Sequence, residues 1–144
     1  MNSGMMVKTA QSDEYETPDW LFKALDAEFG FTFDAAATQA NAKCKLFTGD
    51  IGSGPPQLSL PSQVIFCNPP YSRIALFSMV ALASEAGWLM ILPNFTDRSW
   101  YRRLCYSSRV TLRPFRRRIR FLLNGVVQGS PRFGTILAIV APRD

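Results

Sequence analysis

The apolar residues between positions 63 and 105 alternate between short continuous runs and helical spacing. Continuous runs lie at 63–67 and 88–92, and helical spacing follows each of them, at 72–86 and 97–105. Strands joined by helices pair in parallel, because each helix carries the chain back to the end of the sheet where the previous strand began. The sequence therefore predicts an α/β fold with a mostly parallel sheet.

Further elements are predicted on both sides of this region. Thr17 and Pro18 mark a helix start with Thr17 as the N-cap, Gly30 ends that helix, and residues 31–37 are predicted to form a strand. Three strand patterns occupy the C-terminal part, at 109–113, 118–123 and 134–141. The loop at 124–129 predicts an antiparallel hairpin between the last two.

The composition is that of one globular domain. The chain has 144 residues, of which 47% are apolar, so we expect a single domain over 1–144 with residues 1–12 disordered. The apolar stretch 74–92 contains Glu85, which favours a buried helix followed by a strand over a membrane span. The N-terminus lacks a signal-peptide pattern, so we expect a cytoplasmic protein without a membrane partner.

Histidine is absent from the sequence. This excludes Ser-His-Asp and Cys-His catalysis and an imidazole general base. The cysteines Cys44, Cys67 and Cys105 are widely spaced, so we expect no metal site and no disulfide framework.

Basic side chains are concentrated in the C-terminal third. Residues 1–97 hold five basic and ten acidic side chains, whereas residues 98–143 hold eleven arginines and no acid. Arginine suits phosphate groups, and aromatic residues are interleaved with it here, which favours a DNA-contacting segment. The alternative is that these arginines cover apolar surface. The candidate DNA-binding residues are Arg113, Arg116, Arg117, Arg118 and Arg120.

The tetrapeptide Asn68-Pro69-Pro70-Tyr71 directly follows the predicted strand at 63–67. Carboxyl ends of parallel strands are where ligands bind in α/β sheets. The Asn68 side-chain oxygen and the Pro69 carbonyl can accept both N–H bonds of a conjugated amino group, which localises the nitrogen lone pair for attack on a methyl sulfonium. The prolines stiffen this backbone and Tyr71 offers a face on which a flipped base stacks. The tetrapeptide therefore predicts amino-group methylation.

Several motifs together resemble the phage-type DNA N6-adenine methyltransferases, a Dam-like family common in phages and prophages. The resemblance rests on residues 13–22, 31–37 with 41–44, and 66–72. It also rests on Leu92-Pro93, Thr96-Asp97 and Trp100.

The resemblance implies an abbreviated Rossmann-like, S-adenosylmethionine-dependent methyltransferase that acts on a flipped adenine in double-stranded DNA inside a bacterial host cell. The catalytic residues would be Asn68, Pro69, Pro70 and Tyr71. The cofactor-binding residues would be Thr17, Pro18, Asp34, Ala36 and Asp50. Asp34 is expected to face the cofactor rather than the core. There is no Gly-x-Gly after the first strand, and residues 38–49 are too few for a full second strand.

The sequence leaves three other functions open. The same tetrapeptide serves a methyltransferase for glutamine side chains or other protein amides, although the basic tail favours DNA. A catalytically silent DNA-binding module would keep the same pocket. Cytosine N4 methylation more often uses Ser at the position of Asn68. A monomer is compatible with the sequence. The DNA sequence that the protein recognises does not follow from its amino-acid sequence.

Overall fold

The computed structural model of the chain describes residues 15–129 and 131–144, and the expected disorder of residues 1–12 lies outside them. One sheet has five strands: β1 (Phe33–Asp34), β2 (Val64–Cys67), β3 (Gly87–Pro93), β4 (Val110–Pro114) and β7 (Thr135–Val140). A separate small hairpin consists of β5 (Leu122–Leu123) and β6 (Val126–Val127). The α-helices are α2 (Asp19–Phe29), α3 (Ile74–Ala83) and α4 (Ser99–Tyr106). The 3-10 turns are η1 (Ile51–Ser53), η2 (Pro56–Ser59) and η3 (Tyr71–Arg73).

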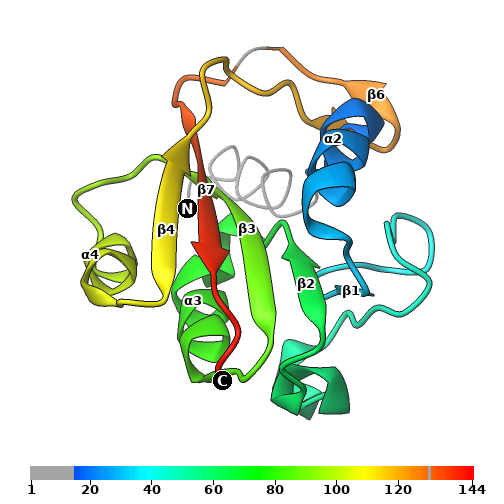
Figure 1. Cartoon of the computed structure of the whole chain (residues 1–144). Coiled ribbons are helices and arrows are strands. Elements are labelled where there is room, and N and C mark those ends of the chain that lie inside the picture. Colours follow the sequence, from blue (N-terminus) through cyan, green and yellow to red (C-terminus); the bar gives the residue numbers. More distant parts are fainter. Residues whose placement is uncertain (1–14, 130) are drawn as a thin grey trace, which may run out of the picture.

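The sheet has the strand order β1-β2-β3-β7-β4. β1, β2 and β3 pair in parallel, and β7 runs antiparallel between β3 and β4. Four of the five strands therefore point the same way, which confirms the predicted α/β fold with a mostly parallel sheet. The carboxyl ends of β2 and β3 lie at the upper edge of the sheet in Figure 1.

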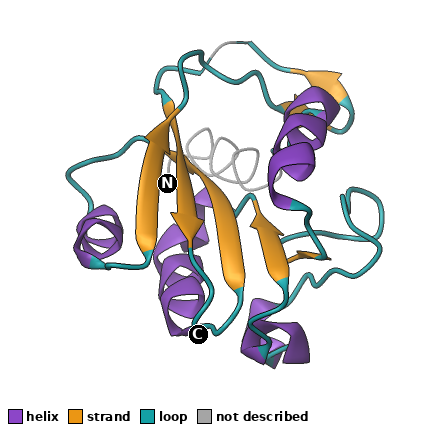
Figure 2. Ribbon diagram, viewed as in Figure 1, coloured by secondary structure: helices purple, strands orange, loops and turns teal. Residues whose placement is uncertain are grey.

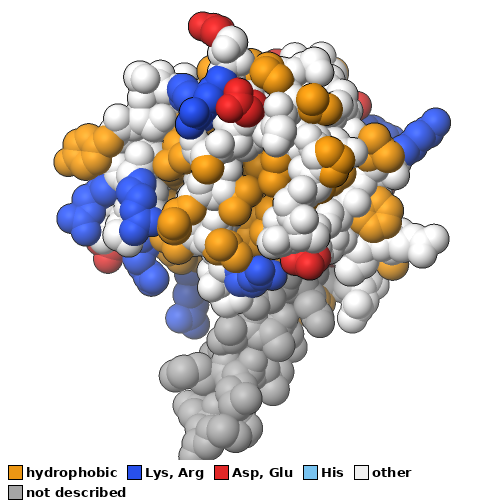
Figure 3. All heavy atoms as spheres, turned by 90° about the horizontal axis from the view of Figure 1, so that it is seen from below, with side chains coloured by type: hydrophobic (Ala, Val, Ile, Leu, Met, Phe, Trp, Pro, Cys, Tyr) orange, Lys and Arg blue, Asp and Glu red, His pale blue; other side chains and the backbone are white. Residues whose placement is uncertain are grey.

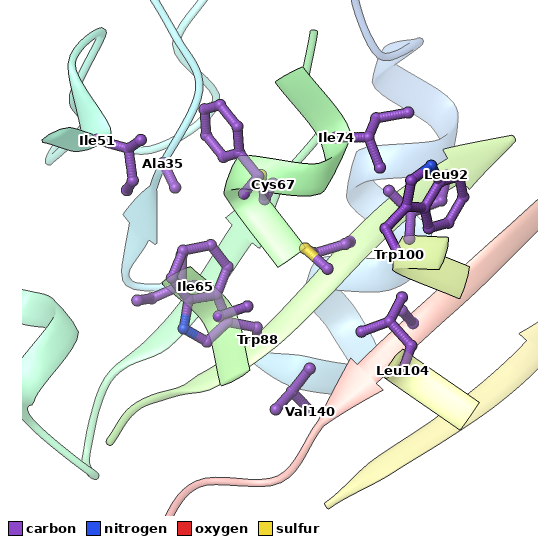
Figure 4. Packing of buried hydrophobic residues seen from close by; sticks show 14 of the residues in the cluster. Ala35, Ile51, Ile65, Cys67, Ile74, Trp88, Leu92, Trp100, Leu104 and Val140 are labelled. Carbon is purple, nitrogen blue, oxygen red and sulfur yellow. The ribbon is translucent and has the colours of Figure 1, made fainter. Parts of the chain in front are cut away.

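Helices cover both faces of the sheet, so that the core has two parts (Figure 2). Alternate residues of β3 point to opposite faces, as in any strand. Trp88, Met90 and Leu92 join the part beneath α3 and α4, which Figure 4 shows from close by. Leu89 and Ile91 join the part beneath α2 and the segment after β4. Every residue of β3 is buried, which makes it the central strand of the fold.

The C-terminal strands pair differently from the prediction. Residues 118–123 do not pair with 134–141, because β7 pairs with β3 and β4. Leu122–Leu123 pairs instead with β6, across a two-residue turn at Asn124 and Gly125. Both turn residues have positive φ, 51° and 79°, as tight hairpin turns require. The predicted antiparallel end of the sheet is therefore the β4–β7 pair, and the predicted 124–129 hairpin loop is wrong.

The first strand is much shorter than the predicted 31–37. Only Phe33–Asp34 is strand, because the chain bends after Asp34 to bond its own side chain. Beside it, Phe47 forms a single parallel bridge with Asp34. This bridge lies where a full second strand was not expected to fit.

Candidate active site

A cavity of about 360 Å³ opens at the carboxyl ends of β1 and β2. Its walls come from the segment before α2, the loop after β1, the loop after β2 and the turn of the β5–β6 hairpin. The lining includes Glu16, Ala36, Asn41, Gly49, Asn68 and Asn124. A second cavity of about 20 Å³ shares Glu16, Ala36, Asn41 and Asn68 with it and reaches Thr17 and Asp34. Of the predicted site residues, the linings of these two cavities bring together Thr17, Asp34, Ala36, Asn68 and Pro70.

The side-chain amide of Asn68 is held by its nitrogen. Nδ2 donates to Thr17 Oγ1 at 3.1 Å and to the Tyr15 carbonyl at 3.3 Å, so that neither bond engages Oδ1. No backbone amide of residues 15–129 and 131–144 donates to the Pro69 carbonyl. Within residues 15–129 and 131–144, therefore, neither the bonds of the Asn68 side chain nor any backbone amide engages the two oxygens that were predicted to accept from an amino group.

The two prolines lead from β2 into α3. Pro69 is buried, and the Pro70 carbonyl accepts from the Arg73 amide at 2.9 Å, which begins η3. Tyr71 lies edge-on to Tyr15, with ring centroids 6.3 Å apart, and to Phe133, at 5.5 Å. Burial raises the pKa of Tyr71, so its hydroxyl stays protonated at neutral pH. The tetrapeptide is thus rigid and uncharged.

A further cavity of about 390 Å³ lies beside Tyr71 and is lined by aromatic residues that include Tyr15, Phe121 and Phe133. Tyr15 also lines the 360 Å³ cavity, together with Asn68 and Pro70. The tetrapeptide therefore stands between two cavities, each large enough for a small organic group.

Thr17 acts on Asn68 and does not cap α2. The N-cap of that helix is Pro18, and no side chain caps it. Thr17 is buried and its hydroxyl accepts from Asn68 instead, so the prediction of an N-cap is wrong. Pro18 lines neither of the cavities beside Asn68 but a separate surface groove.

The predicted cofactor residues after β1 have different environments. Asp34 is 2% exposed; its Oδ1 accepts from the Ala36 amide at 3.2 Å and its Oδ2 from the Lys43 amide at 3.0 Å. Asp34 is thus buried and closes its own loop, contrary to the expectation that it faces the cofactor rather than the core. Ala36 lines both cavities. Asp50 is exposed and accepts from the Gly52 amide, which caps η1.

A protein-family model described as DNA N-6-adenine-methyltransferase (Dam) matches residues 4–136. The chain belongs to this family. The match spans every site residue named above, and the family's activity is methylation of DNA. A search of curated proteins gave no match.

Asp34→Asn should destabilise this Dam-family chain, because an amide has one acceptor oxygen and leaves one of the two backbone N–H groups without a partner. The expected loss is about 1–3 kcal/mol in the free energy of unfolding, measured by urea titration. Burial raises the pKa of Asp34, so the stability of the wild type should fall as pH rises from about 3.9, the unfolded value, through the raised folded value. The variant should lack this slope.

Asp50→Asn is the matched control, since that carboxylate is exposed and accepts from one amide. Equal stability losses in the two variants at every pH would contradict the account of Asp34.

The arginines predicted to contact DNA fall into two groups. Arg113 forms a two-bonded ion pair with Glu28, at 2.9 and 2.8 Å, and Arg118 donates to the Pro131 carbonyl at 2.7 Å. The other group consists of Arg116, Arg117 and Arg120. These side chains are exposed and form no ion pair or hydrogen bond within residues 15–129 and 131–144. These three are free to bind a polyanion.

The end of the molecule opposite the site is shown in Figure 3, viewed from below. Basic side chains lie there in separate groups, with hydrophobic and acidic side chains between them (Figure 3).

Sequence reasoning missed Tyr15 and Glu16. The Tyr15 carbonyl accepts from the side-chain amide of Asn68, and the Tyr15 ring stacks on Phe121 at 6.2 Å with an interplanar angle of 8°. Glu16 pairs with Leu122 through two backbone hydrogen bonds, and its Oε1 accepts from the Gly125 amide at 3.0 Å. The sequence signal that could have identified both residues is their position directly before Thr17, within the motif at 13–22.

Thiol and metal chemistry find no support in the described part of the chain. Burial raises the pKa of Cys44 to about 12 and holds the pKa of Cys67 well above its usual range, so both are thiols at neutral pH. The three cysteines are free, and no group of three or more metal-ligating side chains lies within residues 15–129 and 131–144. No described helix is long and apolar enough to span a bilayer.

Proposed function

We propose that the chain transfers a methyl group from S-adenosylmethionine to the N6 amino group of an adenine flipped out of double-stranded DNA. The observation that carries this proposal is the pair of available acceptors, Asn68 Oδ1 and the Pro69 carbonyl, at a rigid turn between two cavities. We also propose that the sheet is an abbreviated Rossmann-like one.

The 360 Å³ cavity fits the cofactor. Its volume is typical of small-molecule sites, and its lining offers the Glu16 carboxylate for an ammonium group and the Asn41 and Asn124 amides for polar groups. When bound, S-adenosylmethionine supplies a methyl group on a positively charged sulfur. Thr17, Ala36 and Asp34 contribute through the adjoining small cavity.

The 390 Å³ cavity fits the flipped base. Tyr71 and Phe133 present aromatic surface to it, on which an adenine ring stacks. From there the exocyclic amino group reaches Asn68 Oδ1 and the Pro69 carbonyl. The two acceptors draw the N–H bonds out of the ring plane, so that the lone pair points toward the other cavity.

The proton is released after methyl transfer. S-adenosylmethionine would supply the methyl group and keep the electron pair of the broken S–C bond, while Asn68 Oδ1 and the Pro69 carbonyl would hold the amino nitrogen whose lone pair forms the new N–C bond. The methylated nitrogen then carries a positive charge and is strongly acidic, so water accepts its proton. A chain without histidine therefore suffices for this reaction.

The test is transfer of labelled methyl groups. The protein is incubated with S-adenosylmethionine labelled in the methyl group, unmethylated duplex DNA and a bacterial protein extract, and the label in each fraction is counted. We expect the label in DNA. Label in protein would favour the amide methyltransferase, and cofactor binding without transfer would favour the silent DNA-binding module; either outcome would overturn the proposal.

A further inference from the structure

A groove of about 510 Å³ lies on the surface beside the first turn of α2. Its lining includes Pro18, Asp19, Trp20, Arg117, Arg118 and Arg120. None of its lining residues lines the cavities beside Asn68 and Tyr71. The groove is therefore separate from the proposed active site.

Trp20 is the aromatic wall of this groove. Of the three tryptophans in the chain, Trp88 and Trp100 are 2% and 6% exposed, whereas Trp20 is 56% exposed. Its ring contacts Phe115, with centroids 6.3 Å apart, which holds it from one side. Trp20 therefore presents exposed aromatic surface at the wall of a groove, where a planar ligand can stack.

The groove is also positively charged. Arg117 and Arg120 are exposed and have no ion pair or hydrogen bond among the described residues. The acid at its edge, Asp19, is paired with Lys43 at 2.6 Å, and this hydrogen bond lowers the pKa of Asp19. The arginine charges therefore remain available for a ligand.

We propose that this groove binds an unstacked nucleotide of single-stranded DNA, with its base on Trp20 and its phosphates at Arg117 and Arg120. Bases in a duplex are stacked on both faces, so that an exposed indole ring finds a partner only in a base outside the stack. An aromatic platform beside arginines is the combination that holds single strands without sequence preference. The inference rests on the proposed function in that DNA is the substrate.

The probe is an oligothymidylate of about eight nucleotides, within the site sizes known for single-strand binding. Thymine has no exocyclic amino group, so the probe cannot be a methyl acceptor. Because Trp20 is the exposed tryptophan, stacking should quench the solvent-exposed part of the intrinsic fluorescence. Affinity is measured separately by the anisotropy of a dye on the probe.

Trp20→Leu should remove the quenching and weaken binding about 5- to 150-fold, with an unchanged melting temperature. Arg117→Ala combined with Arg120→Ala should weaken binding and flatten its salt dependence. The matched control is Arg102→Ala with Arg103→Ala, which removes the same charge from exposed positions on α4. Equal affinities for the wild type and Trp20→Leu, or equal effects of the two arginine pairs, would overturn the proposal.

Methyl transfer to duplex DNA is measured on the same preparations. Transfer without binding of oligothymidylate would overturn the groove and leave the proposed function standing. Binding of oligothymidylate without any methyl transfer would overturn the proposed function and leave the groove proposal standing.

Discussion

Asn68→Ala is expected to slow methyl transfer to DNA at least a hundredfold while the affinity for S-adenosylmethionine changes little. The lost oxygen accepts from the amino group mainly as its nitrogen becomes tetrahedral, so that its contribution of at least about 2.7 kcal/mol falls on the transition state. The rate is measured under single-turnover conditions and the cofactor affinity by calorimetry. Turnover near that of the wild type would refute the assignment.

Thr17→Val is the companion variant, because valine has the shape of threonine and lacks the hydroxyl that accepts from Asn68 Nδ2. Without this partner the amide keeps the longer bond to the Tyr15 carbonyl and loses part of its orientation. We expect a loss of about tenfold in the single-turnover rate, the effect of one neutral hydrogen bond. A larger loss than that of Asn68→Ala would indicate that Thr17 acts on the cofactor instead.

Replacing Arg116, Arg117 and Arg120 together by Ala should weaken binding to duplex DNA of every sequence. Each guanidinium that neutralises a phosphate releases counterions, so the slope of log K against log salt should flatten by about 0.9 for each phosphate that the variant no longer neutralises. The binding constants are measured by anisotropy over a range of salt concentrations.

Arg113→Ala serves as the control for that triple variant, since Arg113 is already paired with Glu28. It should leave the salt slope unchanged and change the stability little, as expected for an exposed ion pair. A triple variant with the wild-type slope would mean that DNA is held elsewhere.

The parts of the fold that depend on local patterns were predictable. The apolar run at 88–92 lies on a strand that is buried on both faces, and such strands lack polar alternation. The tetrapeptide at 68–71 lies at the carboxyl end of its strand as predicted, because the prolines end the strand regardless of tertiary context.

The parts that depend on distant partners were not predictable. Thr17 has the sequence context of an N-cap, yet its partner Asn68 is 51 residues away. Residues 118–123 have a strand pattern, but they lie beside Glu16 and their own turn rather than beside β7. Asp34 accepts hydrogen bonds from backbone amides in the loop at 36–43. That loop has no periodic apolar pattern, so its path back to the Asp34 carboxylate could not be predicted from the sequence.

The most direct test of the central claim is the identity of the methylated nucleoside. Duplex DNA is treated with the protein and S-adenosylmethionine, digested to nucleosides and analysed by mass spectrometry against standards, with Asn68→Ala in parallel. The account predicts N6-methyladenine with the wild type and at least a hundredfold less with the variant in the same time. N4-methylcytosine as the product, or equal yields of N6-methyladenine from both proteins, would contradict it.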